Sequence, residues 1–313
     1  MPPDWLSVGD EVAAALAAGR PVVALESTLI THGLPWPTNR DTARDAEAAV
    51  RAGGAVPATV AVWHGRPTVG LTADQLEELA RANDVLKASR RDLGAAVGLG
   101  KLAATTVSAT MTLAHAAGAR VFATGGIGGA HRAADGEAAS WDVSADLTEL
   151  ARTPVLVVCA GAKSILDLPR TVELLETLGV PVLGYRTDRF PRFTVADDGN
   201  TLPVSARVET PADAAAVFAA HVRLGGGGAL LGQPCPAEAA VPAEVYDAAL
   251  DRALADANRA GAYGPKATPF VLARLAELTA GRTLAANRAL IVSNAGLAAA
   301  VAVALVHSFG GKA

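Results

Sequence analysis

Cysteine, aromatic residues and a strong charge of either sign are all scarce in this chain of 313 residues. Cys159 and Cys235 are its only cysteines and lack metal-ligand spacing, which excludes a disulfide-stapled fold and a cysteine zinc site. Aromatic residues make up 4% and the net charge is -4, so neither a stacking platform nor a basic stripe for nucleic acid is expected. We therefore expect a reducing compartment and no nucleic-acid partner.

The chain also lacks an apolar run of the kind that targeting signals and membrane spans need. The first twelve residues, MPPDWLSVGDEV, carry charge early, which indicates no signal peptide. The longest apolar stretch, 295–306, is too short to span a bilayer and is predicted to form a buried C-terminal helix. These features predict a cytoplasmic protein with no membrane partner.

Short apolar runs alternate with helical patterns along most of the chain. The runs lack polar alternation, as is typical of strands that are covered on both faces. Helical patterns lie between them at 38–54, 72–83 and 171–180, the first with Thr38 or Asn39 as its N-cap and Gly53 at its end. This alternation predicts an α/β fold with a mostly parallel sheet. The predicted strands are 21–26, 58–63, 119–124, 154–160, 181–185 and 228–232.

Two segments depart from this rhythm. In 193–210, alternating runs flank the sequence DDGN, which predicts a small β-hairpin excursion. The four glycines at 225–228 fit a tight turn better than a domain boundary. Three helical patterns then close the chain.

Ligands of open α/β sheets bind at the carboxyl ends of the strands, so the residues that follow each strand are candidates. Glu26 ends one run, and burial there would raise its pKa towards the range of a general acid; the alternative is a cap for backbone amides. Lys87 lies near Ser89, Arg90 and Arg91. This group could form a phosphate pocket, or Lys87 could be a solvated residue at a helix start.

The segment TGGIGGAHR, from Thr124 to Arg132, places four glycines directly after a strand. Its spacing matches neither a dinucleotide fingerprint nor a nucleotide-triphosphate loop. A backbone cradle for a small sugar phosphate and a plain tight turn both fit it.

Acidic residues follow in WDVSADL. Ser144 has the position of a helix N-cap, and Asp146 suits the first turn of that helix. Alternatively, Asp142 could hold a hard divalent cation through mostly water ligands, and Asp146 could contact substrate hydroxyls.

Lys163 follows the most apolar run of the chain and is expected to open the next helix. Desolvation and a positive helix end both favour the free amine that Schiff-base chemistry needs. The alternative is an ammonium group that binds phosphate.

Taken together, these motifs identify a resemblance. The chain resembles the pseudouridine-5'-phosphate glycosidase family, also called indigoidine synthase A-like, over nearly its whole length. The motifs that match in order include VALESTLITHGLPWPTN, KASRRDL, ATTVSATM, ATGGIGGAHR, WDVSADL, CAGAKSILDLPRT and TPFVLARLAELTAGRTLAANRALIVSNA.

The resemblance implies a three-layer α/β/α fold in a single domain, 1–313, that forms a homotrimer and uses a divalent metal, Mn²⁺ in most members. It implies reversible cleavage of the C–C bond between ribose 5-phosphate and uracil. Lys163 matches the nucleophile that forms a Schiff base, Glu26 the proton donor and Asp142 the metal ligand. The motifs and the resemblance together predict these substrate-binding residues: Lys87, Val107, Thr124, Gly125, Gly126, His131, Ser144, Ala145, Asp146 and Asn287.

The chain departs from the family pattern beside the expected base. The link between His131 and Asp142 is lengthened, Gln233 replaces an asparagine, and three arginines stand where small or acidic residues are usual (Arg186, Arg189 and Arg192). Cleavage of pseudouridine 5'-phosphate is the first hypothesis. The second is attachment of ribose 5-phosphate to another aromatic acceptor, such as a polyketide quinone, and the third is a sugar-phosphate-binding protein without catalysis.

Overall fold

The computed structural model describes residues 2–132, 141–196, 199–262 and 267–310. The first part of the chain forms β1 (Ser7–Val8), α1 (Asp10–Ala17), β2 (Val22–Leu25), the π-helical turn η1 (Leu29–Gly33), α2 (Thr38–Ala52), β3 (Val56–Trp63), β4 (Arg66–Val69), α3 (Ala73–Arg81), β5 (Leu86–Ala88), the 3₁₀ turn η2 (Arg90–Asp92), α4 (Leu93–Gly98), β6 (Ala103–Thr105), α5 (Val107–Ala117) and β7 (Val121–Ala123). It continues with α6 (Ala145–Leu150), β8 (Leu156–Cys159), α7 (Leu168–Thr177), β9 (Val182–Tyr185), β10 (Ala206–Val208), α8 (Pro211–Arg223), β11 (Ala229–Gly232), α9 (Ala243–Ala260), α10 (Ala267–Leu278) and α11 (Arg282–Gly310).

The described strands form one sheet in the order β1-β4-β3-β2-β7-β8-β11-β9-β10, with β6 paired to β3 and β5 paired to β6. Neighbouring strands from β3 to β10 along this order run parallel. Strands β4 and β6 run antiparallel to β3. The predicted α/β fold with a mostly parallel sheet is confirmed.

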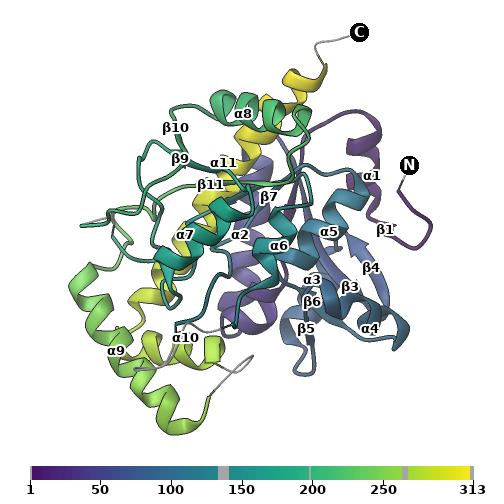
Figure 1. Cartoon of the computed structure of the whole chain (residues 1–313). Helices are drawn as coiled ribbons and strands as arrows, with labels where there is room; N and C mark the ends of the chain where they lie inside the picture. The colour runs from purple at the N-terminus through teal and green to yellow at the C-terminus, as the bar shows by residue number, and fades with distance from the viewer. Residues whose placement is uncertain (1, 133–140, 197–198, 263–266, 311–313) are drawn as a thin grey trace.

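Helices cover both faces of this sheet (Figure 1). Helices α5, α6 and α7 lie in front of the sheet in that view, and α2 and α11 lie behind it. Helix α11 also packs against α8, and α5 packs against α6. Strands β2, β8 and β11 are buried along their whole length because both faces are covered, which explains their unbroken apolar runs.

The predicted helices form close to their expected bounds, with one different cap. Thr72 caps α3 through a reciprocal capping box with Gln75, as the motif at 72–83 suggests. Helix α2 begins at Thr38 after Pro37, so neither Thr38 nor Asn39 is its N-cap. The Asn39 amide instead donates to the carbonyl oxygens of Ile30 and Ala80 at 2.7 and 2.9 Å, which ties η1 and α3 to α2.

The predicted hairpin at 193–210 is wrong. Residues 197–198 of its expected turn lie outside the described residues, but the second run, Ala206–Val208, joins the sheet parallel to β9. This pairing adds the run to the edge of a larger sheet, and an isolated two-stranded hairpin is only marginally stable in water. The glycines at 225–228 form the predicted turn between α8 and β11, with Gly225 at φ 88°.

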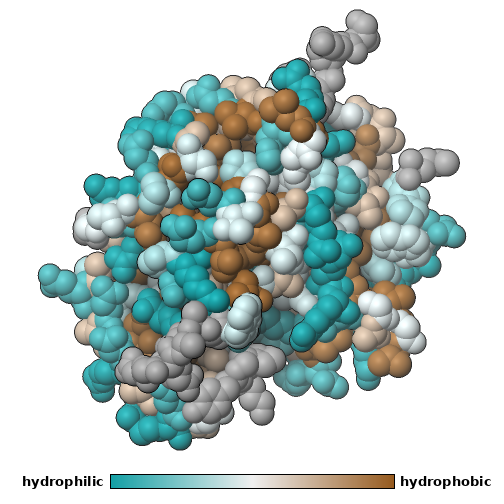
Figure 2. Space-filling model, in the orientation of Figure 1, coloured by the Kyte–Doolittle hydropathy of each residue, from teal (hydrophilic) through white to brown (hydrophobic). Residues whose placement is uncertain are grey.

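Helix α11 is long and apolar enough to cross a membrane, judged by length and composition over Arg282–Val306. In this structure it packs instead against β2, β7 and β8 and against α2 and α8, and more than half of its most apolar stretch is buried. The prediction of a buried C-terminal helix at 295–306 is confirmed. On the face shown in Figure 2, hydrophilic residues predominate, with smaller hydrophobic areas between them.

Candidate active site

Three adjacent parallel strands deliver the central candidate residues to one edge of the sheet. Strand β7 lies between β2 and β8, and all three run the same way. Glu26 follows β2 directly, Thr124 follows β7 directly, and Lys163 comes four residues after β8 ends at Cys159. The carboxyl ends of neighbouring parallel strands meet, so these residues converge as the sequence predicts.

Glu26 is a buried carboxyl group, with 7% of the residue exposed. Its Oε1 accepts a hydrogen bond from the Thr124 hydroxyl, a partner that is a side chain rather than a backbone amide, so the capping alternative is wrong. Burial raises the pKa of Glu26, while the charge of Lys163 and the Thr124 hydrogen bond oppose that rise. A carboxyl group whose pKa is raised holds its proton more readily than an exposed one, as a general acid must.

Lys163 is held by a turn rather than by a helix start. Its backbone N–H donates to the Ile127 carbonyl at 3.1 Å, and its own carbonyl accepts from Leu166 N–H at 3.0 Å. Helix α7 begins at Leu168 with Asp167 as its N-cap, so the expectation that Lys163 opens the helix is wrong. The segment KSILD forms a tight turn first, because Asp167 and the proline that follows Leu168 set a later helix start.

Lys87 is the middle residue of the short strand β5, opposite Ala104 of β6. Burial is the main cause that lowers the pKa of Lys87, and the charge of Lys163 lowers it further. The charges of Glu26 and Asp146 act in the opposite direction. Lys87, Lys163, Glu26 and Asp146 therefore lie close enough to influence one another and form one charged site.

Arg90 and Arg91 do not supplement Lys87 as the sequence suggests. The guanidinium of Arg90 forms a 2.7 Å ion pair with Glu149, whose side chain is fully buried. Arg91 is largely exposed and pairs with Asp92 at 3.3 Å. Of the three cations predicted to form a phosphate pocket, only Lys87 therefore keeps that role, because Arg90 is paired with the buried Glu149 carboxylate.

Backbone N–H groups of the glycine loop after β7 hold the loop in place by donating hydrogen bonds to other parts of the protein. Gly128 N–H donates to Asp146 Oδ2 at 2.8 Å, Ala130 N–H to Thr171 Oγ1 at 3.0 Å and Ile127 N–H to the Gly161 carbonyl at 3.0 Å. These amides are not available to a phosphate. A Cβ at Gly128 would lie 2.6 Å from the Cβ of Ser144, so close approach of the loop to α6 requires glycine there.

Asp146 links this loop to helix α5. Ser144 is the N-cap of α6 and accepts from Asp146 N–H, and Ala145 is the first residue of that helix, as predicted. The Asp146 carboxylate is 5% exposed; its Oδ1 accepts from Ser108 N–H at 2.9 Å. Val107, the first residue of α5, is buried beside this contact.

Asp142 and His131 offer a sparse metal site. The Asp142 side chain is 53% exposed, and its Oδ2 lies 4.0 Å from His131 Nε2. The described part of the chain contains no group of three or more histidine, cysteine, aspartate or glutamate residues that could hold a metal. An exposed carboxylate still fits a hard divalent ion that keeps most of its water ligands. Most of the lengthened segment between these residues, 133–140, lies outside the described residues.

A cavity of about 420 Å³ adjoins the glycine loop on the side of the C-terminal helices. Asn287 and Phe193 line it, and a Cβ at Gly125 would lie 3.2 Å from Asn287 Oδ1. His32 also lines it, and its pKa is lowered by burial and then by the charge of Lys87, which places the cavity near that lysine. The remaining lining residues are Thr31, Gly33, Leu34, Pro35, Thr194, Tyr246, Pro269, Leu272, Ala273, Leu275, Ala276, Thr283 and Leu284.

Sequence reasoning missed two residues that shape this site. The amide of Asn294 donates to the Thr124 carbonyl at 2.9 Å, and Thr171 accepts from Ala130. Asn294 could have been found as a polar side chain within the apolar stretch of the last helix. Gln233, which replaces an asparagine of the family pattern, donates to Ser293 Oγ beside it.

Comparisons with known proteins identify relatives over nearly the whole chain. A pseudouridine-5'-phosphate glycosidase from Herpetosiphon aurantiacus is 56% identical over 304 residues, covering 97% of this chain and 99% of that protein. One from Methylobacterium nodulans is 55% identical, covering 97% and 89%. Among solved structures, the prealnumycin C-glycosynthase AlnA in complex with ribulose 5-phosphate has a TM-score of 0.90 at 41% identity, covering 99% and 100%. An indigoidine synthase A-like protein from Thermotoga maritima has a TM-score of 0.85 at 33% identity, covering 97% and 98%. The family model described as "Indigoidine synthase A like protein" matches residues 11–304, and the chain belongs to this family.

Proposed function

We propose that this protein cleaves pseudouridine 5'-phosphate to uracil and ribose 5-phosphate, reversibly, through a Schiff base on Lys163. The observation that carries the proposal is the convergence of Lys163 and a buried Glu26 at the carboxyl ends of β8 and β2, the two strands on either side of β7. Relatives that share more than half of their residues with this chain are named for this reaction.

A C–C glycosidic bond has no basic leaving oxygen, so the paired carboxylates of O-glycosidases would contribute little. The Lys163 amine instead attacks C1' of the sugar, and the ring oxygen leaves and takes a proton. The bond between C1' and the uracil carbon then breaks, its electron pair stays with uracil, and Glu26 delivers a proton to that carbon. Water hydrolyses the resulting iminium, which releases ribose 5-phosphate and restores the amine.

The other charged groups hold the sugar in place. Lys87 is a partly buried lysine whose charge interacts with that of Lys163, and it can bind the phosphate or a hydroxyl of the opened sugar. Thr124 contacts Glu26 and Ser144 contacts Asp146, so both are expected to line the sugar. The same is expected of their chain neighbours Gly125, Gly126 and Ala145, and of Val107, which precedes the Asp146 partner Ser108.

A divalent metal, expected to be Mn²⁺, would be held by Asp142 with water ligands, and His131 lies beside it. When bound, such an ion supplies positive charge near the sugar phosphate. The homotrimer, the single domain over 1–313 and the cytoplasmic location also stay predictions; light scattering of the purified protein tests the first of these.

The test is release of uracil from pseudouridine 5'-phosphate by the purified protein with Mn²⁺, followed by chromatography. Lys163→Ala is the control and is expected to release none. Failure of the wild-type protein both to release uracil and to condense it with ribose 5-phosphate contradicts the proposal.

A second candidate function is C-ribosylation of a larger aromatic acceptor in natural-product biosynthesis. The cavity beside Asn287 favours it, since about 420 Å³ with walls from Leu272, Phe193 and Tyr246 falls in the range that holds drug-sized ligands. The similarity to AlnA, a prealnumycin C-glycosynthase, supports it as well. Incubation of polycyclic quinones with ribose 5-phosphate and the protein would give a product heavier by the sugar phosphate less the one water that the condensation releases, measured by mass spectrometry. No such product, together with efficient uracil release, contradicts this candidate.

A further inference from the structure

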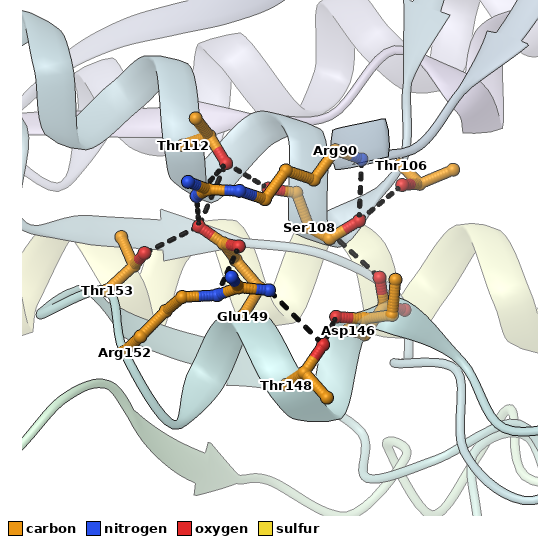
Figure 3. Close-up of polar contacts among 10 residues, drawn as sticks. Arg90, Thr106, Ser108, Thr112, Asp146, Thr148, Glu149, Arg152 and Thr153 are labelled. Carbon is orange, nitrogen blue, oxygen red and sulfur yellow. Dashed lines mark hydrogen bonds and ion pairs between the residues drawn. The ribbon is translucent and has the colours of Figure 1, made fainter. Parts of the chain in front are cut away.

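Glu149 is a fully buried carboxylate to which neither the motifs nor the proposed chemistry assigns a role. Its Oε1 accepts hydrogen bonds from Arg90 Nη1 at 2.7 Å, Thr112 Oγ1 at 2.9 Å and Thr153 Oγ1 at 2.5 Å, and Arg152 Nε lies 3.2 Å from Oε2 (Figure 3). A buried charge destabilises a protein unless it is paired and hydrogen-bonded. Three donors meet Oε1, whereas the buried Oε2 has Arg152 as an ion-pair partner and no hydrogen bond among the described residues. These partners come from three separate parts of the chain.

The network leads from Glu149 into the candidate active site (Figure 3). The backbone N–H of Arg90 donates to Ser108 Oγ at 3.3 Å, and the backbone N–H of Ser108 donates to Asp146 Oδ1 at 2.9 Å. Arg90 also lies three residues after Lys87, at the start of the turn η2 that follows β5. A shift of Arg90 would therefore be transmitted to both Lys87 and Asp146.

We propose that the Glu149–Arg90 ion pair is a positioning pair, which fastens η2 to α5 and α6 and so fixes Lys87 in the sugar-phosphate site. Arg90 and Glu149 act through Lys87 and Asp146 and do not touch the substrate. This inference rests on the proposed function, because Lys87 is the predicted sugar-phosphate contact.

Arg152 supplies a matched control within the same network. It pairs with the other oxygen of Glu149, but its side chain is 52% exposed and its further contact is Thr148 on the surface of α6. Among the described residues it makes no contact with Ser108 or with η2. Loss of either arginine removes one cation from Glu149, and only loss of Arg90 releases the turn beside Lys87.

The experiment compares Arg90→Met with Arg152→Met by borohydride trapping of the ribose 5-phosphate adduct over a range of sugar concentrations. We expect the half-saturating concentration to rise about tenfold in Arg90→Met, the effect of weakening one contact to a charged group. The maximal trapping rate should change far less, and Arg152→Met should resemble the wild type. Arg90→Lys, which keeps a cation for Glu149, should recover part of the loss.

If Arg90→Met does not fold, Ser108→Ala provides the test, because it leaves the buried ion pair intact. It removes the Oγ that accepts from the Arg90 amide at 3.3 Å and that also lies 3.1 Å from Thr106 Oγ1. It should raise the half-saturating concentration in the same direction. The inference is overturned if the half-saturating concentration of ribose 5-phosphate is unchanged in the folded Arg90 and Ser108 variants while the thermal midpoints of Arg90→Met and Arg152→Met fall equally. Absence of trapping in the wild type overturns the proposed function itself.

Discussion

Asp146→Asn is the most informative single change to the framework of the site. The carboxylate is 5% exposed and accepts two backbone hydrogen bonds, from Ser108 N–H at 2.9 Å and Gly128 N–H at 2.8 Å. An asparagine keeps one acceptor oxygen in the same shape. Its NH₂ group must then face the other backbone N–H, so one donor meets another donor.

The expected loss of stability follows from these contacts. One charge-assisted hydrogen bond is worth about 1.5–3 kcal/mol, and leaving a buried N–H without an acceptor costs about 1–3 kcal/mol. The sum predicts a loss of about 2.5–6 kcal/mol in the free energy of unfolding, which is large for a change of one atom type. The loss of the Asp146 charge also removes a cause that raises the pKa of Glu26.

The assay is urea unfolding of Asp146→Asn beside Asp142→Asn. The control makes the same chemical change four residues earlier on a side chain that is 53% exposed, so its expected cost is below about 0.5 kcal/mol. An equal loss in the free energy of unfolding for the two variants would refute the conclusion that the buried Asp146 carboxylate holds α5 and the glycine loop together. A cost below about 1 kcal/mol for Asp146→Asn would refute it as well.

Three further predictions follow from the same contacts. Glu26→Gln should abolish uracil release yet leave the Lys163 adduct trappable. Burial raises the pKa of Glu26 in the folded protein, so its stabilising contribution is present in acid and is lost as the pH rises through that pKa. Glu26→Gln should therefore be more stable than the wild type at neutral and alkaline pH, and the difference in stability should close in acid. A difference in thermal midpoint that does not change with pH would contradict this. Gly128→Ala should destabilise by about 1–3 kcal/mol in urea unfolding, since its Cβ meets Ser144 and Asp146, whereas Gly94→Ala in helix α4, where a Cβ meets nothing within 4 Å, should not destabilise. Thr124→Val should move the Glu26 limb of the pH–rate profile to higher pH, because the lost hydrogen bond opposes the rise in the pKa of Glu26, and Thr124→Ser should not; equal profiles for both would contradict that role.

Much of the fold was predictable because its strands are buried on both faces. Strands β2, β7, β8, β9 and β11 stand out as unbroken apolar runs. Their order in the sheet sets the carboxyl ends side by side, which is why Glu26, Thr124 and Lys163 could be grouped before the structure was known.

The errors concern residues whose surroundings come from distant parts of the chain. The sequence predicted Arg90 to be part of a phosphate pocket. Its partner Glu149 lies 59 positions away in the chain, and sequence spacing gives no sign that the two residues pair. Asn39 looked like a helix cap, yet its amide reaches carbonyl groups of η1 and α3. The 193–210 segment had the alternation of a hairpin, and tertiary pairing with β9 decided otherwise.

The central claim, that Lys163 is the nucleophile, is tested most directly by locating the trapped adduct. Two lysines, Lys163 and Lys87, share the site, and burial lowers the pKa of Lys87, which makes Lys87 the alternative nucleophile. Borohydride reduction with ribose 5-phosphate, followed by proteolysis and mass spectrometry, should place the added mass on the peptide CAGAKSILDLPR and remove it in Lys163→Ala. Added mass on Lys87, or on neither lysine, would contradict the account.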